Sequence, residues 1–185
     1  MTRLEFLREG IKDMRTVGTI TRSSRYLCRG MIKPVDFSEA KVIVELGAGD
    51  GVLTRHILEQ MRPDAILLTF EIVDKFCELI RNTIHDDRLV VIQDSAENLP
   101  AHLAEHGFEK ADYILSAIPF ILLPRDAARR IITISRDSLK PGGRFTQMHY
   151  SLALKSLYED IFETVKLSFV PLNIPPAFVL SCQSS

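Results

Sequence analysis

The sequence predicts an α/β fold with a mostly parallel, seven-stranded sheet and a C-terminal antiparallel hairpin. Between residues 41 and 150, apolar segments of strand length alternate with segments of helical periodicity, which is the pattern of a parallel sheet. The last two strand-like segments, 164–170 and 177–182, are joined by a short stretch rich in proline. Because a connection this short cannot cross over to form a parallel pair, we expect these two strands to be antiparallel.

The individual elements follow from composition and from turn residues. We expect strands at 41–46, 65–70, 89–93, 111–117, 144–150, 164–170 and 177–182. We expect helices at 52–60, 74–84 and 124–139, and a turn at 140–143. The length of 185 residues suits one domain over 1–185, with an N-terminal helical segment at 1–33 and the core at 41–185.

Composition and charge exclude several classes of protein. The formal net charge of −1 and the isoelectric point of about 6.5 lack the basic excess of nucleic-acid-binding proteins, so nucleic acid is not an expected partner. No apolar run approaches the roughly 18 residues of a membrane span. The N-terminus also lacks the apolar region of a signal peptide. We therefore expect a cytoplasmic protein.

A glycine cluster follows the first expected strand. Gly47, Gly49 and Gly51 have the spacing G-x-G-x-G and lie just before a helix. Glycine permits positive φ and lets a ligand approach the backbone closely. Dinucleotide sites have the different spacing G-x-G-x-x-G and keep the helix N-terminus open for an anion. Because Asp50 lies within this loop, the cluster favours a cationic ligand.

Carboxylates follow the second and third expected strands. Glu71 lies at the end of strand 65–70, about 20 residues beyond the glycines, where an acid can accept hydrogen bonds from ribose hydroxyls. Asp94, Ser95 and Ala96 follow strand 89–93, and their polar groups suit an adenine amino group. Ligands of open α/β sheets bind at the carboxyl ends of strands. The three markers together therefore predict a nucleoside-containing ligand at this edge.

These motifs resemble those of class I S-adenosylmethionine-dependent methyltransferases, which have a Rossmann-like fold. The resemblance covers residues 41–150, with V-E-L-G-A-G-D-G as its first motif. It implies that S-adenosylmethionine is the cofactor, with its methionine part on the glycine loop, its ribose on the acid after strand two and its adenine near residues 94–96. The cofactor-binding residues so implied are Glu45, Gly47, Gly49, Gly51, Glu71, Asp94, Ser95, Ala96 and Ser116.

A narrower resemblance is to the bacterial phospholipid N-methyltransferases. It rests on four segments of this chain: 19–24, 116–120, 143–147 and 173–177. Two features differ from that family, since Ala117 replaces the glycine of its S-G-L-P motif and the chain has no tryptophan. The resemblance implies N-methylation of the phosphatidylethanolamine head group. The expected partner is therefore a small-molecule or lipid-headgroup substrate.

Two other functions stay open. The first is that of the ribosomal RNA adenine N6-methyltransferases, whose first motif is related. Their N-(L/P)-P-(Y/F) loop begins with an asparagine, whereas this loop begins at Ser116. The second is a non-catalytic module that keeps the cofactor site. Titration with S-adenosylhomocysteine shows whether the protein binds the cofactor. A methyl-transfer assay with lipid and with RNA distinguishes the lipid enzyme, the RNA enzyme and the non-catalytic module.

Candidate catalytic residues lie at the ends of strands four and five. His149 or the phenolate of Tyr150 could deprotonate an ammonium acceptor. The rings of Phe120 and Tyr150 could stabilise a growing positive charge. Ordinary strand-end packing is the alternative for these residues. His102 and His106 have a spacing that can bind a metal, but no third ligand accompanies them, so we expect no metal.

Residues 3–15 have the pattern of an amphipathic helix. Leu4, Leu7, Ile11 and Met14 fall on one narrow arc, and basic side chains flank it. Such a helix can lie in a bilayer surface, with its cations toward anionic head groups. A helix packed on the domain's own core is the alternative. With a lipid acceptor, the first interpretation gives a peripheral protein on the inner face of the membrane.

Overall fold

The structure, a computed structural model, describes residues 24–184. The amphipathic segment 3–15 and most of the motif at 19–24 lie outside the described residues, so the membrane-surface helix and the single domain over 1–185 stay predictions. Within 24–184 the strands form one seven-stranded sheet in the order β3-β2-β1-β4-β5-β7-β6. The strands are β1 (Val42–Leu46), β2 (Ile66–Phe70), β3 (Leu89–Ile92), β4 (Ala111–Ser116), β5 (Leu139–His149), β6 (Thr164–Val170) and β7 (Ala177–Gln183).

The pairing of the strands confirms the predicted fold class. β1 pairs in parallel with β2 and β4, β2 pairs in parallel with β3, and β4 pairs in parallel with β5. β7 is antiparallel to both β5 and β6. The short connection at 171–176 therefore makes the hairpin that its length requires. Consequently β6 runs in the same direction as β5.

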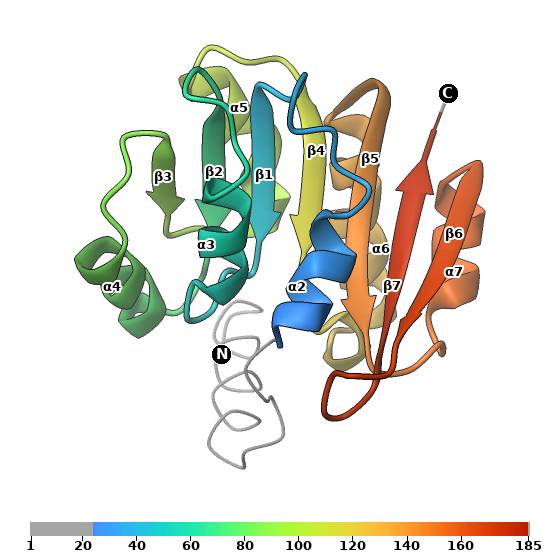
Figure 1. Cartoon of the computed structure of the whole chain (residues 1–185). Helices are drawn as coiled ribbons and strands as arrows, with labels where there is room; N and C mark the ends of the chain where they lie inside the picture. Colours follow the sequence, from blue (N-terminus) through green and yellow to red (C-terminus); the bar gives the residue numbers. More distant parts are fainter. Residues whose placement is uncertain (1–23, 185) are drawn as a thin grey trace.

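Helices cover both faces of the sheet (Figure 1). They are α2 (Arg25–Ile32), α3 (Val52–Leu58), α4 (Asp74–Thr83), α5 (Leu99–Glu105), α6 (Arg125–Asp137) and α7 (Lys155–Ile161), with short 3₁₀ helices η1 (Ala96–Asn98) and η2 (Phe120–Leu122). Apolar residues of α2 and α3 pack in one core cluster, and those of α5, α6 and α7 pack in the other. None of the helices within 24–184 is long and apolar enough to cross a membrane.

Strand β5 is longer than the sequence predicts. The stretch 140–143, expected to be a turn, belongs to this strand, and Leu139 pairs with Ala111. A register shift between Ala111 and Tyr113 accommodates the extra residues. Gly143 lies where a Cβ atom would come within 2.8 Å of Asp112 O. Glycine at this position thus allows the backbones of β4 and β5 to approach closely. The turn-like composition of 140–143 does not indicate this pairing.

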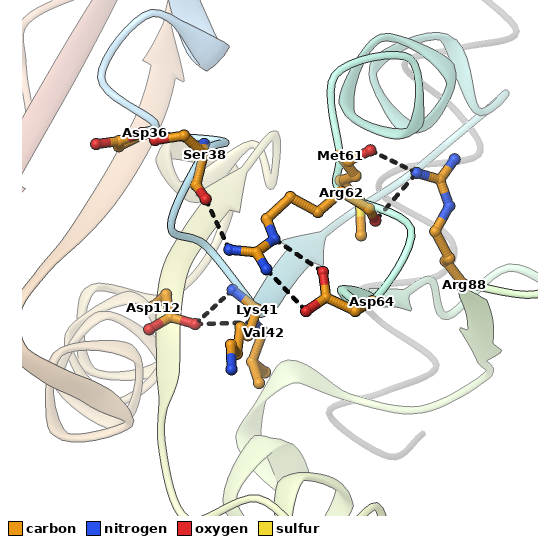
Figure 2. Close-up of polar contacts among 9 residues, drawn as sticks. All are labelled: Asp36, Ser38, Lys41, Val42, Met61, Arg62, Asp64, Arg88 and Asp112. Atoms are coloured by element: carbon orange, nitrogen blue, oxygen red, sulfur yellow. Dashed lines mark hydrogen bonds and ion pairs between the residues drawn. The ribbon is translucent and has the colours of Figure 1, made fainter.

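Polar contacts join the loops at the amino edge of the sheet (Figure 2). Asp112 Oδ2 accepts hydrogen bonds from the backbone N–H groups of Lys41 and Val42, at 2.9 and 2.8 Å. Arg88 donates to the carbonyl oxygen of Met61 at 2.7 Å. The first two bonds tie the start of β1 to the start of β4, and the third ties the start of β3 to the segment between α3 and β2. This edge is therefore held by structural contacts, and the opposite edge carries the candidate site.

Candidate active site

The predicted site residues gather at the carboxyl edge of the parallel strands. Loops that follow β1, β2, β3 and β4 carry the glycine cluster, Glu71, Asp94 and the segment 117–120, respectively. In Figure 1 the arrowheads of β1, β2, β4 and β5 point toward the lower edge of the view, where α2 also lies. Parallel strands bring these loops together although they are far apart in the sequence.

The three glycines of the glycine loop have the positive φ angles that glycine favours. Gly47, Gly49 and Gly51 have φ values of 78°, 58° and 77°. A Cβ atom on Gly47 would meet Ile118 N at 3.2 Å, so the loops after β1 and β4 touch through backbone. Gly51 is the N-cap of α3. The loop is therefore a tight turn that presents backbone at the carboxyl edge.

Glu71 holds the glycine loop in place. Its Oε2 accepts a hydrogen bond from Gly49 N at 2.8 Å, and its Oε1 accepts from Ile72 N at 2.9 Å and Val73 N at 3.0 Å. The residue is buried. A carboxylate has about four acceptor positions, so one stays available for a ligand hydroxyl after these three bonds. The sequence predicted the ligand-facing role of this acid but not its contact with Gly49.

Glu45 is a buried carboxyl at the end of β1. Its Oε2 accepts from Thr54 Oγ1 at 2.7 Å and from Thr69 Oγ1 at 3.0 Å, and its Oε1 has no hydrogen-bond partner within the described part of the chain. Burial raises the pKa of Glu45 to about 7; the two threonine hydrogen bonds oppose this rise, and the charge of Glu71 adds to it. An incompletely paired acid among other carboxylates would be stabilised by a nearby cation. This chemistry fits a sulfonium or ammonium ligand.

Asp94 is positioned by groups from the segment after it. Its Oδ1 accepts from Ser95 N at 2.7 Å, Asn98 Nδ2 donates to both carboxylate oxygens, and His102 Nε2 lies 2.8 Å from its Oδ2. Partial burial works to raise the pKa of Asp94, but hydrogen bonds from His102 and Asn98 outweigh it and lower the pKa. His102 thus orients Asp94. Within residues 24–184 no cluster of three His, Cys, Asp or Glu is arranged to hold a metal.

The loop after β4 is held from two sides. The hydroxyl of Ser116 accepts a hydrogen bond from Ile118 N at 3.3 Å, and Gln147 Nε2 donates to Ile118 O at 3.0 Å. Gln147 belongs to the segment 143–147, but the sequence pattern does not identify it as a site residue. Phe120 is 1% exposed and packs in the core on the α5–α7 side of the sheet. Its ring therefore fixes the loop, and no open face is available to a substrate in this conformation.

The two candidate residues at the end of β5 have different surroundings. The imidazole of His149 is 7% exposed, and its Nε2 lies 2.9 Å from the Tyr158 hydroxyl oxygen on α7. Burial lowers the pKa of His149 to about 4, which makes it a weak base. Tyr150 is 36% exposed; burial of its phenol raises its pKa, although a hydrogen bond with Asn173 opposes this. Tyr150 is therefore a neutral phenol near neutral pH, not a phenolate.

A family model described as a methyltransferase domain matches residues 43–143. The chain belongs to this family. The matched range runs from β1 to the start of β5 and contains the glycine loop, Glu71 and Asp94. Together with the fold, it confirms the expected class of enzyme, an S-adenosylmethionine-dependent methyltransferase.

Similar proteins support this membership. The methyltransferase is 28% identical over 180 residues to an ornithine lipid N-methyltransferase of Singulisphaera acidiphila, with 96% of this chain and 94% of that protein covered. A Burkholderia thailandensis 1,6-didemethyltoxoflavin-N1-methyltransferase, solved with S-adenosylhomocysteine, has a TM-score of 0.73 at 17% identity and covers 98% and 88% of the two chains. Human methyltransferase-like protein 13 has a TM-score of 0.70 at 16% identity and covers 88% and 83%. The last two similarities show the fold.

The methyltransferase should lose stability in mild acid through His149. The folded pKa of about 4 lies below the ordinary value of 6.5, so between these values the unfolded chain binds a proton that the folded protein does not. The stability is complete above pH 6.5 and falls as the pH drops toward 4. We expect a His149→Gln variant, which cannot titrate, to lose about 1–2 kcal/mol less unfolding free energy than wild type between pH 7 and 5. Urea titrations at both pH values measure this; an equal loss in both proteins contradicts the buried neutral imidazole.

Proposed function

We propose that this methyltransferase transfers a methyl group from S-adenosylmethionine to the amine nitrogen of a lipid head group. The observation that carries the proposal is the similarity to the ornithine lipid N-methyltransferase, which extends over almost the whole of both chains. Phosphatidylethanolamine is our preferred acceptor, because four segments of this chain resemble the phospholipid N-methyltransferases. Ornithine also carries a primary amine, so the two lipids offer the same reacting group.

The residues of the site divide the tasks of binding. The glycine loop and Glu71 would hold the methionine and ribose parts of the cofactor, and Asp94 would hold its adenine. Asp50 in the glycine loop and the ionised fraction of the buried Glu45 add negative charge there, which favours a cationic donor. When bound, S-adenosylmethionine supplies an already activated methyl group. The protein's main task is then to align the acceptor nitrogen with that group and to exclude water.

The acceptor ammonium must lose its proton before it can attack. We assign its positioning to Tyr150, a residue that is 36% exposed and lies at the carboxyl edge, at the end of β5. His149 stays a candidate base from the sequence, although its imidazole contacts Tyr158. In this proposal the proton passes to solvent, and partial desolvation of the amine among the uncharged residues 117–124 and 150–154 favours its neutral form.

Methyl transfer to competing acceptors tests the proposal. Labelled S-adenosylmethionine is supplied with detergent-dispersed phosphatidylethanolamine, detergent-dispersed ornithine lipid or ribosomal RNA, and a thermal-shift titration with S-adenosylhomocysteine runs in parallel. We expect incorporation into at least one lipid and none into RNA. Incorporation into RNA alone overturns the lipid acceptor. Cofactor binding without transfer to any acceptor, over a range of pH, supports the non-catalytic alternative.

A further inference from the structure

Large apolar side chains are exposed on three loops at the carboxyl edge. Ile121 and Leu122 follow β4, Leu152 follows β5, and Leu172 and Ile174 lie in the β6–β7 loop. We refer to these five residues as the apolar rim. Ile174 is 81% exposed and Leu172 is 62% exposed, values that are unusual for branched aliphatic side chains in a folded domain. The rim lies on the same edge of the sheet as the candidate active site.

The β6–β7 loop is built to hold its two apolar side chains outward. Between them lies Asn173, which is 1% exposed. Its Oδ1 accepts from Ser24 N at 3.1 Å, at the start of α2, and its Nδ2 donates to Pro175 O at 2.7 Å. The loop, dark red at the lower edge of Figure 1, is thus tied to the body of the protein beside α2. The exposure of Leu172 and Ile174 is therefore a feature of a fixed loop.

The charge pattern around the rim indicates which kind of surface it meets. Residues 117–124, 150–154 and 167–181 contain no Asp, Glu, Lys or Arg. A cation adjoins one end of each stretch. Arg125 follows 117–124 at the start of α6, Lys155 follows 150–154 at the start of α7, and Lys166 precedes 167–181 in β6. Lys155 also pairs with Glu159. Uncharged apolar tips with cations behind them match a bilayer surface, where side chains enter the interface and cations face anionic head groups.

We propose that the apolar rim inserts into the surface of an anionic bilayer and places the carboxyl-edge site against the lipid head groups. This inference rests on the proposed lipid acceptor. The rim is a second membrane contact, besides the helix expected at 3–15. A bilayer accepts separate apolar tips without a complementary shape, whereas a protein partner would need a fitted surface. The rim therefore explains how the enzyme reaches an acceptor that does not leave the membrane.

A single introduced tryptophan reports insertion directly, because the chain contains none. In the full-length protein, Ile174→Trp is compared with Leu79→Trp on α4, whose leucine is 39% exposed and lies outside the three loops. Vesicles of phosphatidylethanolamine with phosphatidylglycerol are added, with and without brominated acyl chains. We expect a blue shift and quenching for Ile174→Trp and neither for Leu79→Trp. An unshifted, unquenched Ile174→Trp overturns the proposal, as does a shift that needs no vesicles and grows with protein concentration, which would indicate a second copy.

Glutamate substitutions separate this proposal from the proposed function. We expect Leu172→Glu/Ile174→Glu to weaken vesicle binding at least fivefold, with the affinity for S-adenosylhomocysteine and transfer to detergent-dispersed lipid unchanged. Leu79→Glu is the matched control and should bind vesicles as wild type does. Vesicle binding unchanged in the double variant overturns the rim. If the double variant loses vesicle binding while wild type fails to methylate dispersed lipid, the rim stands and the lipid acceptor falls.

Discussion

Gly49→Val is expected to weaken S-adenosylhomocysteine binding by roughly 100-fold or more, about 2.7 kcal/mol. Gly49 has a φ of 58°, a conformation that a β-branched residue adopts only with strain. Its N–H donates to Glu71 Oε2, so a shift of the backbone at this point also breaks the contact that holds the loop. The valine side chain would in addition occupy the place that the resemblance assigns to the cofactor's methionine part. Isothermal titration calorimetry gives the affinity.

The matched control is Gly142→Val. Gly142 has a φ of 77° and open space where its Cβ would be, and it lies in β5 at the amino edge of the sheet. This variant carries a comparable backbone strain far from the site. It should therefore lower the melting temperature while leaving S-adenosylhomocysteine affinity within about twofold of wild type. Similar affinity losses in both variants would mean that Gly49→Val acts only through stability, and the glycine-loop assignment would fail.

The positions of the strands along the chain could be predicted because each is a run of apolar residues bounded by turn signals. Their mostly parallel direction followed from the alternation of these runs with helical segments, whereas their order in the sheet comes from the structure. The hairpin at 164–182 followed from the length of one loop. Helix α7 was not predicted, because Lys155–Ile161 is only seven residues long and so short a segment shows little helical periodicity. That its apolar residues share one buried face is known only from the core cluster they join. The start of β5 was missed because K-P-G-G has the composition of a turn, whereas the register shift in β4 lets it pair.

In the site, sequence patterns located residues that follow strands and missed residues that act from elsewhere. Glu71 and Asp94 lie one and two residues after the ends of β2 and β3, so strand prediction alone places them at one edge. The partners that orient them, Gly49 and His102, become apparent only from tertiary contacts. The burial of Phe120 could not be predicted either, because it depends on how α5 and α6 pack on the sheet. A strand end is equally suited to substrate contact and to core packing, and only the neighbouring helix decides between them.

Glu71→Ala is expected to weaken S-adenosylhomocysteine binding by roughly 1.5–3 kcal/mol, the range for hydrogen bonds to a charged group. The carboxylate accepts from Gly49, Ile72 and Val73, so its removal leaves three backbone N–H groups without their acceptor and releases the glycine loop. It also removes the group expected to bind the ribose hydroxyls. Titration calorimetry measures the loss, and circular dichroism verifies that the variant is folded.

Two further variants separate loop support from ligand contact. Glu78→Ala removes an exposed carboxylate of α4 and is expected to bind as wild type, which controls for the change in charge. Glu71→Gln keeps one acceptor oxygen but turns an N–H₂ group toward backbone donors, so it should disturb the loop while keeping the side-chain volume. If Glu71 mainly supports the loop, both the Glu71→Gln and the Glu71→Ala variant should lose affinity by different factors for adenosine and for S-adenosylhomocysteine, because adenosine lacks the methionine part that the loop is expected to hold. If it mainly binds ribose, both ligands weaken equally. A loss below about threefold for Glu71→Ala with both ligands would mean that the acid takes no part in cofactor binding.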